Sequence, residues 1–235
     1  MKSDKPVMLI TGTSRGIGRY LAEYYLEKGW SVFGCARQES GLDHENFTSF
    51  TVDLSDESHI DQMFSELKNH TRRIDAVINN AGIASMNLLN LTPYATAQKI
   101  FSVNVLGTFS ILQKSVRFLK KSDTPRIVNF STVAVPLRLS GESLYAASKS
   151  AVETMTRILA KELSAMNITC NSVGPAPIRT DLIKGVGDEK IAALLKQMAI
   201  HRLAEFKDVS NVIDFFLSPA SDMVTGQIVY LGGVG

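Results

Sequence analysis

The chain has 235 residues, of which 45% are hydrophobic and 20% charged, and its 25 Lys and Arg against 23 Asp and Glu leave a net charge of +2. A charge this small, carried by residues dispersed along the chain, argues against binding to nucleic acid or to an anionic membrane surface. The length suits one sizeable core, and no apolar run approaches the ~20 residues that cross a bilayer, so we expect a single cytoplasmic domain over residues 1–235.

Short apolar segments alternate with amphipathic ones along the whole chain. The apolar segments predict strands over Val7–Thr11, Trp30–Ala36, Phe47–Val52, Ala76–Asn79, Ile127–Ser131, Ile168–Val173 and Ile228–Leu231. The amphipathic segments predict helices over Gly18–Lys28, Glu57–Arg72, Tyr94–Lys120, Tyr145–Met166 and Val209–Leu217. Because the apolar runs are continuous, as in strands covered on both sides, we predict an α/β fold, a doubly wound parallel sheet of about seven strands with helices on both faces. Cys35 and Cys170 fall within such strands and are expected to be buried and reduced.

The segment 178–204 interrupts this alternation. It has helical, partly apolar character and follows the sixth predicted strand, at the edge of the sheet where open α/β folds bind ligands. We expect a substrate lid over about 178–204, with a simple packing helix as the alternative.

The first predicted strand runs into a glycine-rich turn that begins a helix. Its residues are Gly12, Thr13, Ser14, Arg15, Gly16, Ile17 and Gly18. Gly12 suits a tight turn, Gly16 lets a pyrophosphate approach the backbone, and Gly18 lets the helix pack closely against the sheet. This context predicts a dinucleotide-binding turn in a Rossmann-type sheet.

The end of the second predicted strand bears on the choice of dinucleotide. NAD-preferring proteins place a carboxylate there, which holds the 2′-hydroxyl of the ribose. This chain instead reads Gly34-Cys35-Ala36-Arg37. Arg37 and Arg15 offer guanidinium groups that suit a 2′-phosphate. The expected cofactor is therefore NADP(H).

Tyr145 and Lys149 lie four residues apart on one predicted helix, so that their side chains share a face. An ammonium beside a phenol favours the phenolate and lowers the pKa of the tyrosine toward the range that acid–base catalysis needs. The pair predicts a proton-transfer site in which Lys149 lowers the pKa of Tyr145.

Taken together, these motifs resemble those of the short-chain dehydrogenase/reductase family, in particular members similar to 3-oxoacyl-carrier-protein reductases. The turn TGTSRGIG has the family's G-x-x-x-G-x-G spacing, and Tyr145 with Lys149 forms its Y-x-x-x-K motif. The resemblance implies an NADPH-dependent oxidoreductase that moves a hydride between the nicotinamide and a small carbonyl or alcohol substrate. It also implies a homotetramer or homodimer.

The resemblance assigns roles to further residues. Register without gaps places Thr132 where the family carries a serine that holds the substrate oxygen, and a slip of one residue would place Ser131 there. Asn104 corresponds to an asparagine that holds a water linked to Lys149. The remaining implied cofactor contacts, besides Tyr145 and Lys149 themselves, are Asp53, Leu54, Asn80, Ala81, Gly82, Pro175, Ala176, Ile178 and Thr180.

Three departures from the family pattern leave alternatives open. Thr132 replaces a serine, Ala176 a glycine and Leu231 a common aspartate, which motivates a second hypothesis of a catalytically weak NADP-binding protein with a structural or regulatory role. Asp123 and the pair at 166–167 stand where carrier-protein reductases use basic residues for docking, so a free ketone and a carrier-bound acyl group both remain candidate substrates. We expect the substrate pocket near residues 84–87, 135–139 and the lid, and no metal site.

Overall fold

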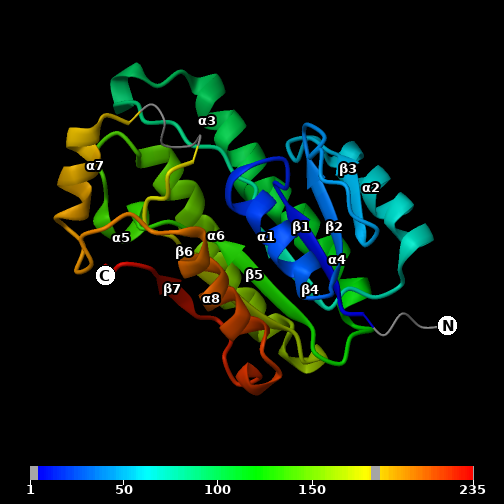
Figure 1. The fold of residues 1–235 in the computed structure, drawn as a ribbon. Coiled ribbons are helices and arrows are strands. Elements are labelled where there is room, and N and C mark those ends of the chain that lie inside the picture. The colour runs from blue at the N-terminus through cyan, green and yellow to red at the C-terminus, as the bar shows by residue number, and fades with distance from the viewer. Residues whose placement is uncertain (1–4, 181–185, 235) are drawn as a thin grey trace.

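The computed structural model describes residues 5–180 and 186–234, and within these ranges seven strands form one parallel sheet in the order β3-β2-β1-β4-β5-β6-β7 (Figure 1). The strands are β1 (Val7–Thr11), β2 (Ser31–Ala36), β3 (Phe47–Thr51), β4 (Ala76–Asn79), β5 (Arg126–Phe130), β6 (Thr169–Gly174) and β7 (Ile228–Tyr230). The strand order reverses between β1 and β4, and such a reversal opens a crevice at the carboxyl ends of the strands. The predicted fold class is confirmed.

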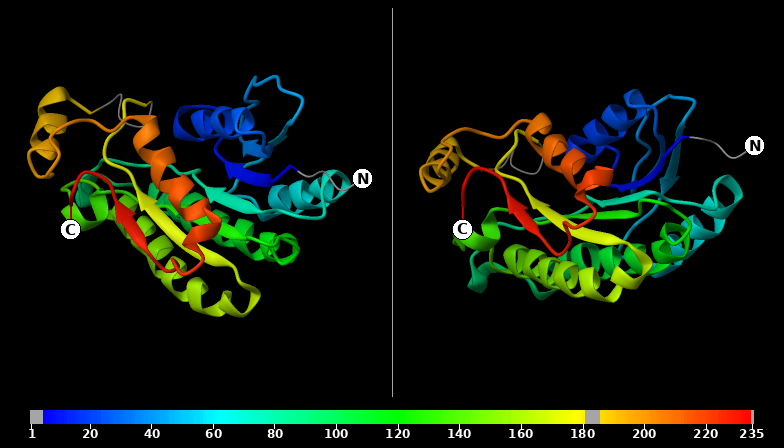
Figure 2. Two further views of the ribbon diagram at one scale, coloured as in Figure 1. Left: turned by 60° about the horizontal axis from the view of Figure 1, so that its bottom comes forward. Right: turned by 90° about the horizontal axis from the view of Figure 1, so that it is seen from below.

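Helices cover both faces of the sheet (Figure 2). The longer ones are α1 (Gly16–Glu27), α2 (Glu57–His70), α3 (Tyr94–Phe101), α4 (Thr108–Leu119), α6 (Ser143–Glu162), α7 (Asp188–Leu195) and α8 (Phe206–Leu217). Side chains alternate between the two faces along a strand, and this alternation builds the two layers. Met8 and Ile10 of β1 pack in a cluster with residues of α1 and α8, whereas Val7 and Leu9 pack in a second cluster with residues of α2 and α4.

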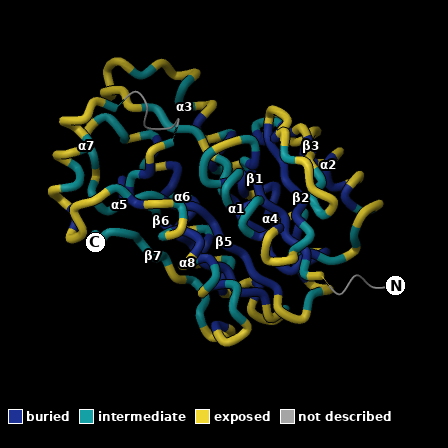
Figure 3. Tube along the Cα trace, in the orientation of Figure 1, coloured by how far each residue is buried: buried dark blue, intermediate teal, exposed yellow. Residues whose placement is uncertain are grey.

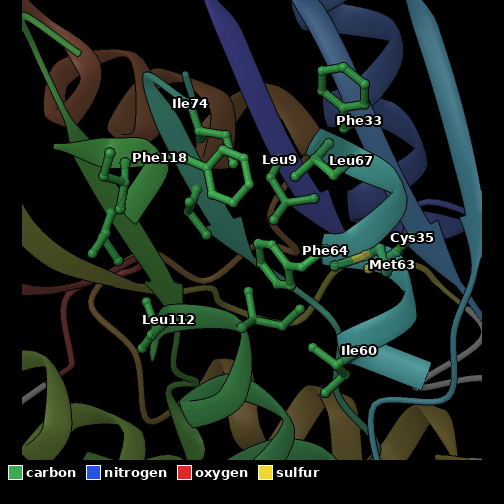
Figure 4. Packing of buried hydrophobic residues seen from close by; sticks show 14 of the residues in the cluster. Leu9, Phe33, Cys35, Ile60, Met63, Phe64, Leu67, Ile74, Leu112 and Phe118 are labelled. Carbon is green, nitrogen blue, oxygen red and sulfur yellow. The ribbon is translucent and has the colours of Figure 1, made fainter. Parts of the chain in front are cut away.

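The core holds the central strands rigidly in place. Every residue of β1 and of β5 is buried. Figure 3 shows buried residues along the strands and exposed residues along the outer turns. On the α2 and α4 side, Leu9 lies among Phe64, Leu67 and Phe118, each no more than 3% exposed (Figure 4). The loops at the carboxyl ends of the strands therefore start from a well-packed scaffold.

The helical region after β4 differs from the single helix predicted over Tyr94–Lys120. A short turn η1 (Leu89–Leu91) precedes α3, and a π-helical segment η2 (Ser102–Gly107) separates α3 from α4. A Cβ atom on Gly107 would lie 2.6 Å from the carbonyl oxygen of Leu54, so the segment passes very close to the chain that follows β3. π-helical turns are rare, frequently mark functional sites, and leave no simple periodic signal.

Smaller elements complete the described chain. They are α5 (Ala134–Leu137), η3 (Ser164–Met166) and η5 (Pro219–Ser221). Of the predicted lid over 178–204, residues 181–185 lie outside the described residues, and α7 occupies the middle of the segment. Cys35 and Cys170 are buried and form no disulfide, as expected. None of the helices in the described ranges has both the length and the apolar character needed to cross a membrane.

Candidate active site

A cavity of about 1220 Å³ lies at the carboxyl ends of the strands. The segments that directly follow β1 to β6 line this cavity, together with the start of α6. The predicted site residues that line it are Gly12, Ser14, Arg15, Gly16, Ile17, Arg37, Asp53, Leu54, Asn80, Ala81, Gly82, Ser131, Thr132, Tyr145, Lys149, Pro175, Ala176, Ile178 and Thr180. Thr13, Gly18 and Asn104 do not line it and are buried behind its wall.

The glycine turn at one end of the cavity has no room for larger side chains. Gly12 has a φ of +81°, and a Cβ atom added to it would lie 2.7 Å from Nδ2 of Asn80. A Cβ on Gly18 would lie 2.3 Å from the carbonyl oxygen of Gly12. Asn80 fixes the turn by donating from Nδ2 to the carbonyl oxygen of Thr11 at 2.9 Å. The start of α1, at Gly16 and the following residue, therefore borders the cavity, as anion-binding helix N-termini do.

Charged side chains in the segments after β1, β2 and β3 include two exposed arginines and one aspartate that is hydrogen-bonded within the protein. Arg15 and Arg37 are exposed and line the cavity, and residues 35–38 include no carboxylate. Asp53 is already engaged by the protein: its Oδ1 accepts from the hydroxyl of Ser55 at 2.6 Å and its Oδ2 accepts from Nζ of Lys99 at 3.3 Å. Burial opposes ionisation of Asp53, but these hydrogen bonds prevail and lower its pKa to about 2.

Tyr145 and Lys149 are brought to the middle of the cavity by α6 and are 8% and 4% exposed. The expected lowering of the tyrosine pKa is not borne out. Burial raises the pKa of Tyr145 to about 12, although a hydrogen bond with the side chain of Thr132 opposes the rise. Burial also lowers the pKa of Lys149 to about 8, and its Nζ donates to the carbonyl oxygen of Phe130 at 2.9 Å. The two residues lie one turn apart on α6, as predicted, but burial is the largest influence on both pKa values, and it shifts each of them toward its neutral form.

The hydroxyls of Ser131 and Thr132 differ in what they contact. The Ser131 hydroxyl donates to Oε1 of Glu153, which also accepts from the hydroxyl of Tyr230 at 2.5 Å. The Thr132 side chain instead interacts with the phenol of Tyr145. Of the two alternatives left open by the sequence, Thr132 is the residue placed next to the phenol.

Asn104, in the π-helical segment, is fully buried with its amide held by protein groups. Its Oδ1 accepts from the backbone N–H of Ile83 at 2.9 Å, and its Nδ2 donates to the carbonyl oxygen of Ile83 at 2.9 Å and to the hydroxyl of Ser148 at 3.0 Å. A Cβ atom on Gly82 would lie 3.3 Å from both Oδ1 of Asn104 and Nζ of Lys149. The absence of a side chain at Gly82 thus leaves these two groups facing the same narrow space.

The far end of the cavity is lined mostly by residues of the ranges predicted for the substrate pocket. Ala84, Met86 and Leu139 line it within the predicted ranges. Lys190, Ile191 and Leu194 of α7 line it within the predicted lid, whereas Glu142, directly before α6, lies outside every predicted range. The sequence analysis did not predict a role for Glu142 or Glu153. Glu142 directly precedes α6 and Glu153 lies on it, and an isolated glutamate at either place is ordinary. Their spacing of three residues before Tyr145 and four after Lys149 is the signal available in the sequence.

Comparison with known proteins extends over nearly the whole chain. Residues 12–233 match a protein family described as enoyl-(acyl carrier protein) reductase. The 3-oxoacyl-[acyl-carrier-protein] reductase of Vibrio cholerae is 29% identical, over 99% of this chain and 98% of that protein. The ligand-free aldohexose dehydrogenase of Thermoplasma acidophilum superposes with a TM-score of 0.89 at 25% identity, covering 97% of this chain and 93% of that one. The Pseudomonas aeruginosa RhlG/NADP active-site complex has a TM-score of 0.86 at 25% identity, covering 97% and 95%.

Proposed function

Because this chain belongs to the short-chain dehydrogenase/reductase family, we propose that it is an NADPH-dependent oxidoreductase that moves a hydride between the nicotinamide and a small carbonyl or alcohol substrate. The observation that carries the proposal is the convergence of Tyr145, Thr132 and Lys149 in the cavity bordered by the glycine turn. A phenol poised next to a second hydroxyl favours an active enzyme over a catalytically weak binding protein.

The cavity offers a consistent set of groups for the cofactor. The turn from Gly12 to Gly18 and the start of α1 would hold the pyrophosphate, and Asp53 and Leu54 would border the adenine. A Cβ atom on Gly16 would lie 3.7 Å from the side chain of Thr180, so the turn and the segment after β6 enclose the same space from two sides. The same cavity is lined by Tyr145 and by residues that follow β4 and β6, namely Asn80, Ala81, Gly82, Pro175, Ala176 and Ile178.

When bound, the cofactor supplies the hydride, and the chain's own residues manage the oxygen and its proton. In the reductive direction Tyr145 donates its phenolic proton to the substrate oxygen, and Thr132 donates a hydrogen bond that steadies the charge developing there. Lys149, with Asn104 beside it across Gly82, resupplies the proton to Tyr145. A tyrosine pKa of about 12 keeps the phenol protonated near neutral pH, which suits its proposed role as the proton donor in reduction.

The residues at the expected carrier-docking positions favour a free carbonyl compound as substrate over a carrier-bound one. Asp123 and Asn167 are exposed at the places where carrier-protein reductases carry basic docking residues, and neither would attract an acidic carrier. We propose that the segment 178–204 is the substrate lid, because Ile191 and Leu194 of α7 line the cavity.

The proposed function is tested by following NADPH and NADH oxidation with a panel of small ketones and aldehydes. Turnover with none of them, together with tight NADPH binding, would favour the binding-protein alternative.

Exchanging the charge at Arg37 is expected to change the cofactor preference. Arg37→Asp removes a charge-assisted contact to the 2′-phosphate and sets a carboxylate against it, so kcat/KM for NADPH should fall about 10- to 100-fold while that for NADH changes little. The measurement is the ratio of the two kcat/KM values. Arg72→Asp, the same exchange at an exposed site outside the cavity, should leave the ratio unchanged. A wild-type enzyme that uses both cofactors equally well would contradict the assignment.

We also propose that the chain forms a homotetramer or homodimer through the helical region 94–119 and α6. This region exposes apolar side chains that a monomer would leave in water: Leu106 is 61% exposed, Phe109 49% and Ile158 49%. Phe109→Glu would place a charge in the contact and is expected to shift the protein toward a monomer, as judged by light scattering after size-exclusion chromatography. Phe109→Leu keeps the surface apolar and should keep the assembly. A wild-type chain that is monomeric at assay concentrations would refute the proposal.

A further inference from the structure

Glu142 lies at the far end of the cavity, directly before α6. It stands three residues before Tyr145, so that both residues belong to the same side of the first helical turn, and both line the cavity. The charge of Glu142 also contributes to the raised pKa of Tyr145. The carboxylate is therefore close enough to the reacting phenol to contact a molecule whose carbonyl oxygen is held there.

The Glu142 carboxylate has no hydrogen-bond partner among residues 5–180 and 186–234. In the described ranges, hydrogen bonds reach only its backbone: its N–H donates to the carbonyl oxygen of Leu139 at 3.2 Å, and its carbonyl oxygen accepts from the N–H of Ala146 at 2.8 Å. The residue is half-buried, and burial raises the pKa of the carboxyl group. Among the described residues, the other carboxylate that lines the cavity belongs to Asp53, which by contrast accepts hydrogen bonds from Ser55 and Lys99. A partly buried acceptor without a partner is stabilised when a ligand donates a hydrogen bond to it.

The surroundings of Glu142 narrow the class of ligand. Met86 and Leu139 provide apolar walls, and α7 lies on the same side of the molecule as α5 (Figure 1). Among the residues that the structure describes, the cations that line the cavity nearby are Lys149, whose ammonium already donates to the Phe130 carbonyl, and Lys190, which is exposed on α7. A ligand carboxylate would meet the negative charge of Glu142, whereas a hydroxyl or ammonium group would donate to it.

We propose that Glu142 is a specificity-determining residue that accepts a hydrogen bond from a hydroxyl or ammonium group of the substrate. This inference rests on the proposed function. It assigns to the enzyme carbonyl compounds that carry a hydrogen-bond donor at a short distance from the reacting carbon, and it excludes keto acids. The hydroxyl and the ammonium group present the same donor chemistry, and the experiment separates them.

The test compares four ketones of nearly equal size with NADPH: hydroxyacetone, aminoacetone, butanone and pyruvate. The hydroxyl, methyl and carboxylate members are repeated with two more methylene groups, as 5-hydroxy-2-pentanone, 2-hexanone and levulinate, so that both short and longer reaches to Glu142 are covered. The wild-type kcat/KM for the donor-bearing ketones should exceed that for butanone or 2-hexanone about tenfold or more at one of the two lengths, and that for the keto acids by a wider margin. A preference for aminoacetone over hydroxyacetone would identify the ammonium form.

Three variants locate this preference. Glu142→Leu should bring the ratio of donor-bearing to unsubstituted ketone close to one. Glu142→Gln should retain the hydroxyl preference, reduce use of aminoacetone and admit pyruvate, since the amide both accepts and donates. Glu189→Gln makes the same change on α7 outside the cavity and should behave as wild type. NADPH binding and thermal unfolding are measured for each variant to show that fold and cofactor site persist.

The outcomes distinguish the inference from the proposed function. If the wild type turns over ketones but Glu142→Leu leaves all ratios unchanged at both lengths, the inference is wrong and the proposed function stands. A wild-type preference for pyruvate or levulinate also overturns the inference, and would point to Lys190 instead. If the wild type turns over no ketone, the proposed function fails first and the inference fails with it.

Discussion

Tyr145→Phe is expected to lower kcat for ketone reduction by about 10²- to 10⁴-fold, the contribution of a positioned general acid. In the proposed function the phenol donates a proton to the substrate oxygen, and the variant removes this hydroxyl while keeping the ring that packs in the cavity wall. Because burial raises the pKa of Tyr145 to about 12, the phenol is protonated throughout the ordinary pH range. The loss should therefore be similar at every pH between about 6 and 7, where Lys149 also keeps its proton.

The same substitution should leave the cofactor site and the fold intact. NADPH affinity, measured by fluorescence titration, is expected to stay within about twofold of wild type, since an uncharged hydroxyl contributes little to the binding of a large dinucleotide. Tyr94→Phe provides a matched control, because Tyr94 is 78% exposed on α3 and does not line the cavity. A Tyr145→Phe enzyme with more than about a third of wild-type kcat would rule out proton donation by this residue.

Much of the site followed from the sequence because of the geometry of parallel sheets. The carboxyl ends of parallel strands lie at one edge, so residues that directly follow successive strands must meet there. Gly12, Arg37, Asp53, Asn80 and Thr132 each follow a different strand, and all five line the cavity. Predicting the strands was therefore enough to predict which residues come together.

The pKa of Tyr145 shows where this reasoning stops. Helical spacing correctly places Lys149 on the same face, but it carries no information about how deeply the pair is buried. With exposures of 8% and 4%, desolvation raises the pKa of the phenol and lowers that of the ammonium. Burial depends on the packing of segments that are distant in the chain, which one helix cannot report.

The polar contacts behind the cavity wall were equally hidden. Asn104 was expected near Lys149 through a family resemblance, but its full burial depends on the π-helical turn over 102–107, for which the sequence offers no periodic signal. Glu153 joins Ser131 of one strand end to Tyr230 of β7, across about a hundred residues of chain. The sequence predicts the order of these elements along the chain. It does not predict how far apart their side chains lie in the folded protein, and such contacts depend on that distance.

Lys149→Met is expected to lower kcat for reduction by about 10²-fold and to change the pH profile. In the wild type the pKa of Lys149 is lowered by burial to about 8, so the ammonium to which we assign the resupply of the proton is present below that pH and is lost above it. The wild-type rate should accordingly fall as the pH rises through about 8, whereas the methionine variant should be slow and flat across the same range. Lys161→Met, on an exposed position of α6, should keep both the rate and the profile of wild type.

Stability measurements separate this effect from unfolding. The folded-state pKa of Lys149 lies below its ordinary value of 10.5, so the unfolded chain binds this proton more readily, and the residue costs stability as the pH falls from about 10.5 to about 8, with no further change below. Methionine removes that cost but leaves the carbonyl oxygen of Phe130 without its donor, a loss of about 1–3 kcal/mol. Because the two effects oppose each other, the melting temperature at pH 7 should move by only a few degrees, about 2–4 °C per kcal/mol for a chain of this size. A wild-type rate that stays level up to pH 10 would show that Lys149 does not titrate in the proton path, and the role assigned to it would have to be withdrawn.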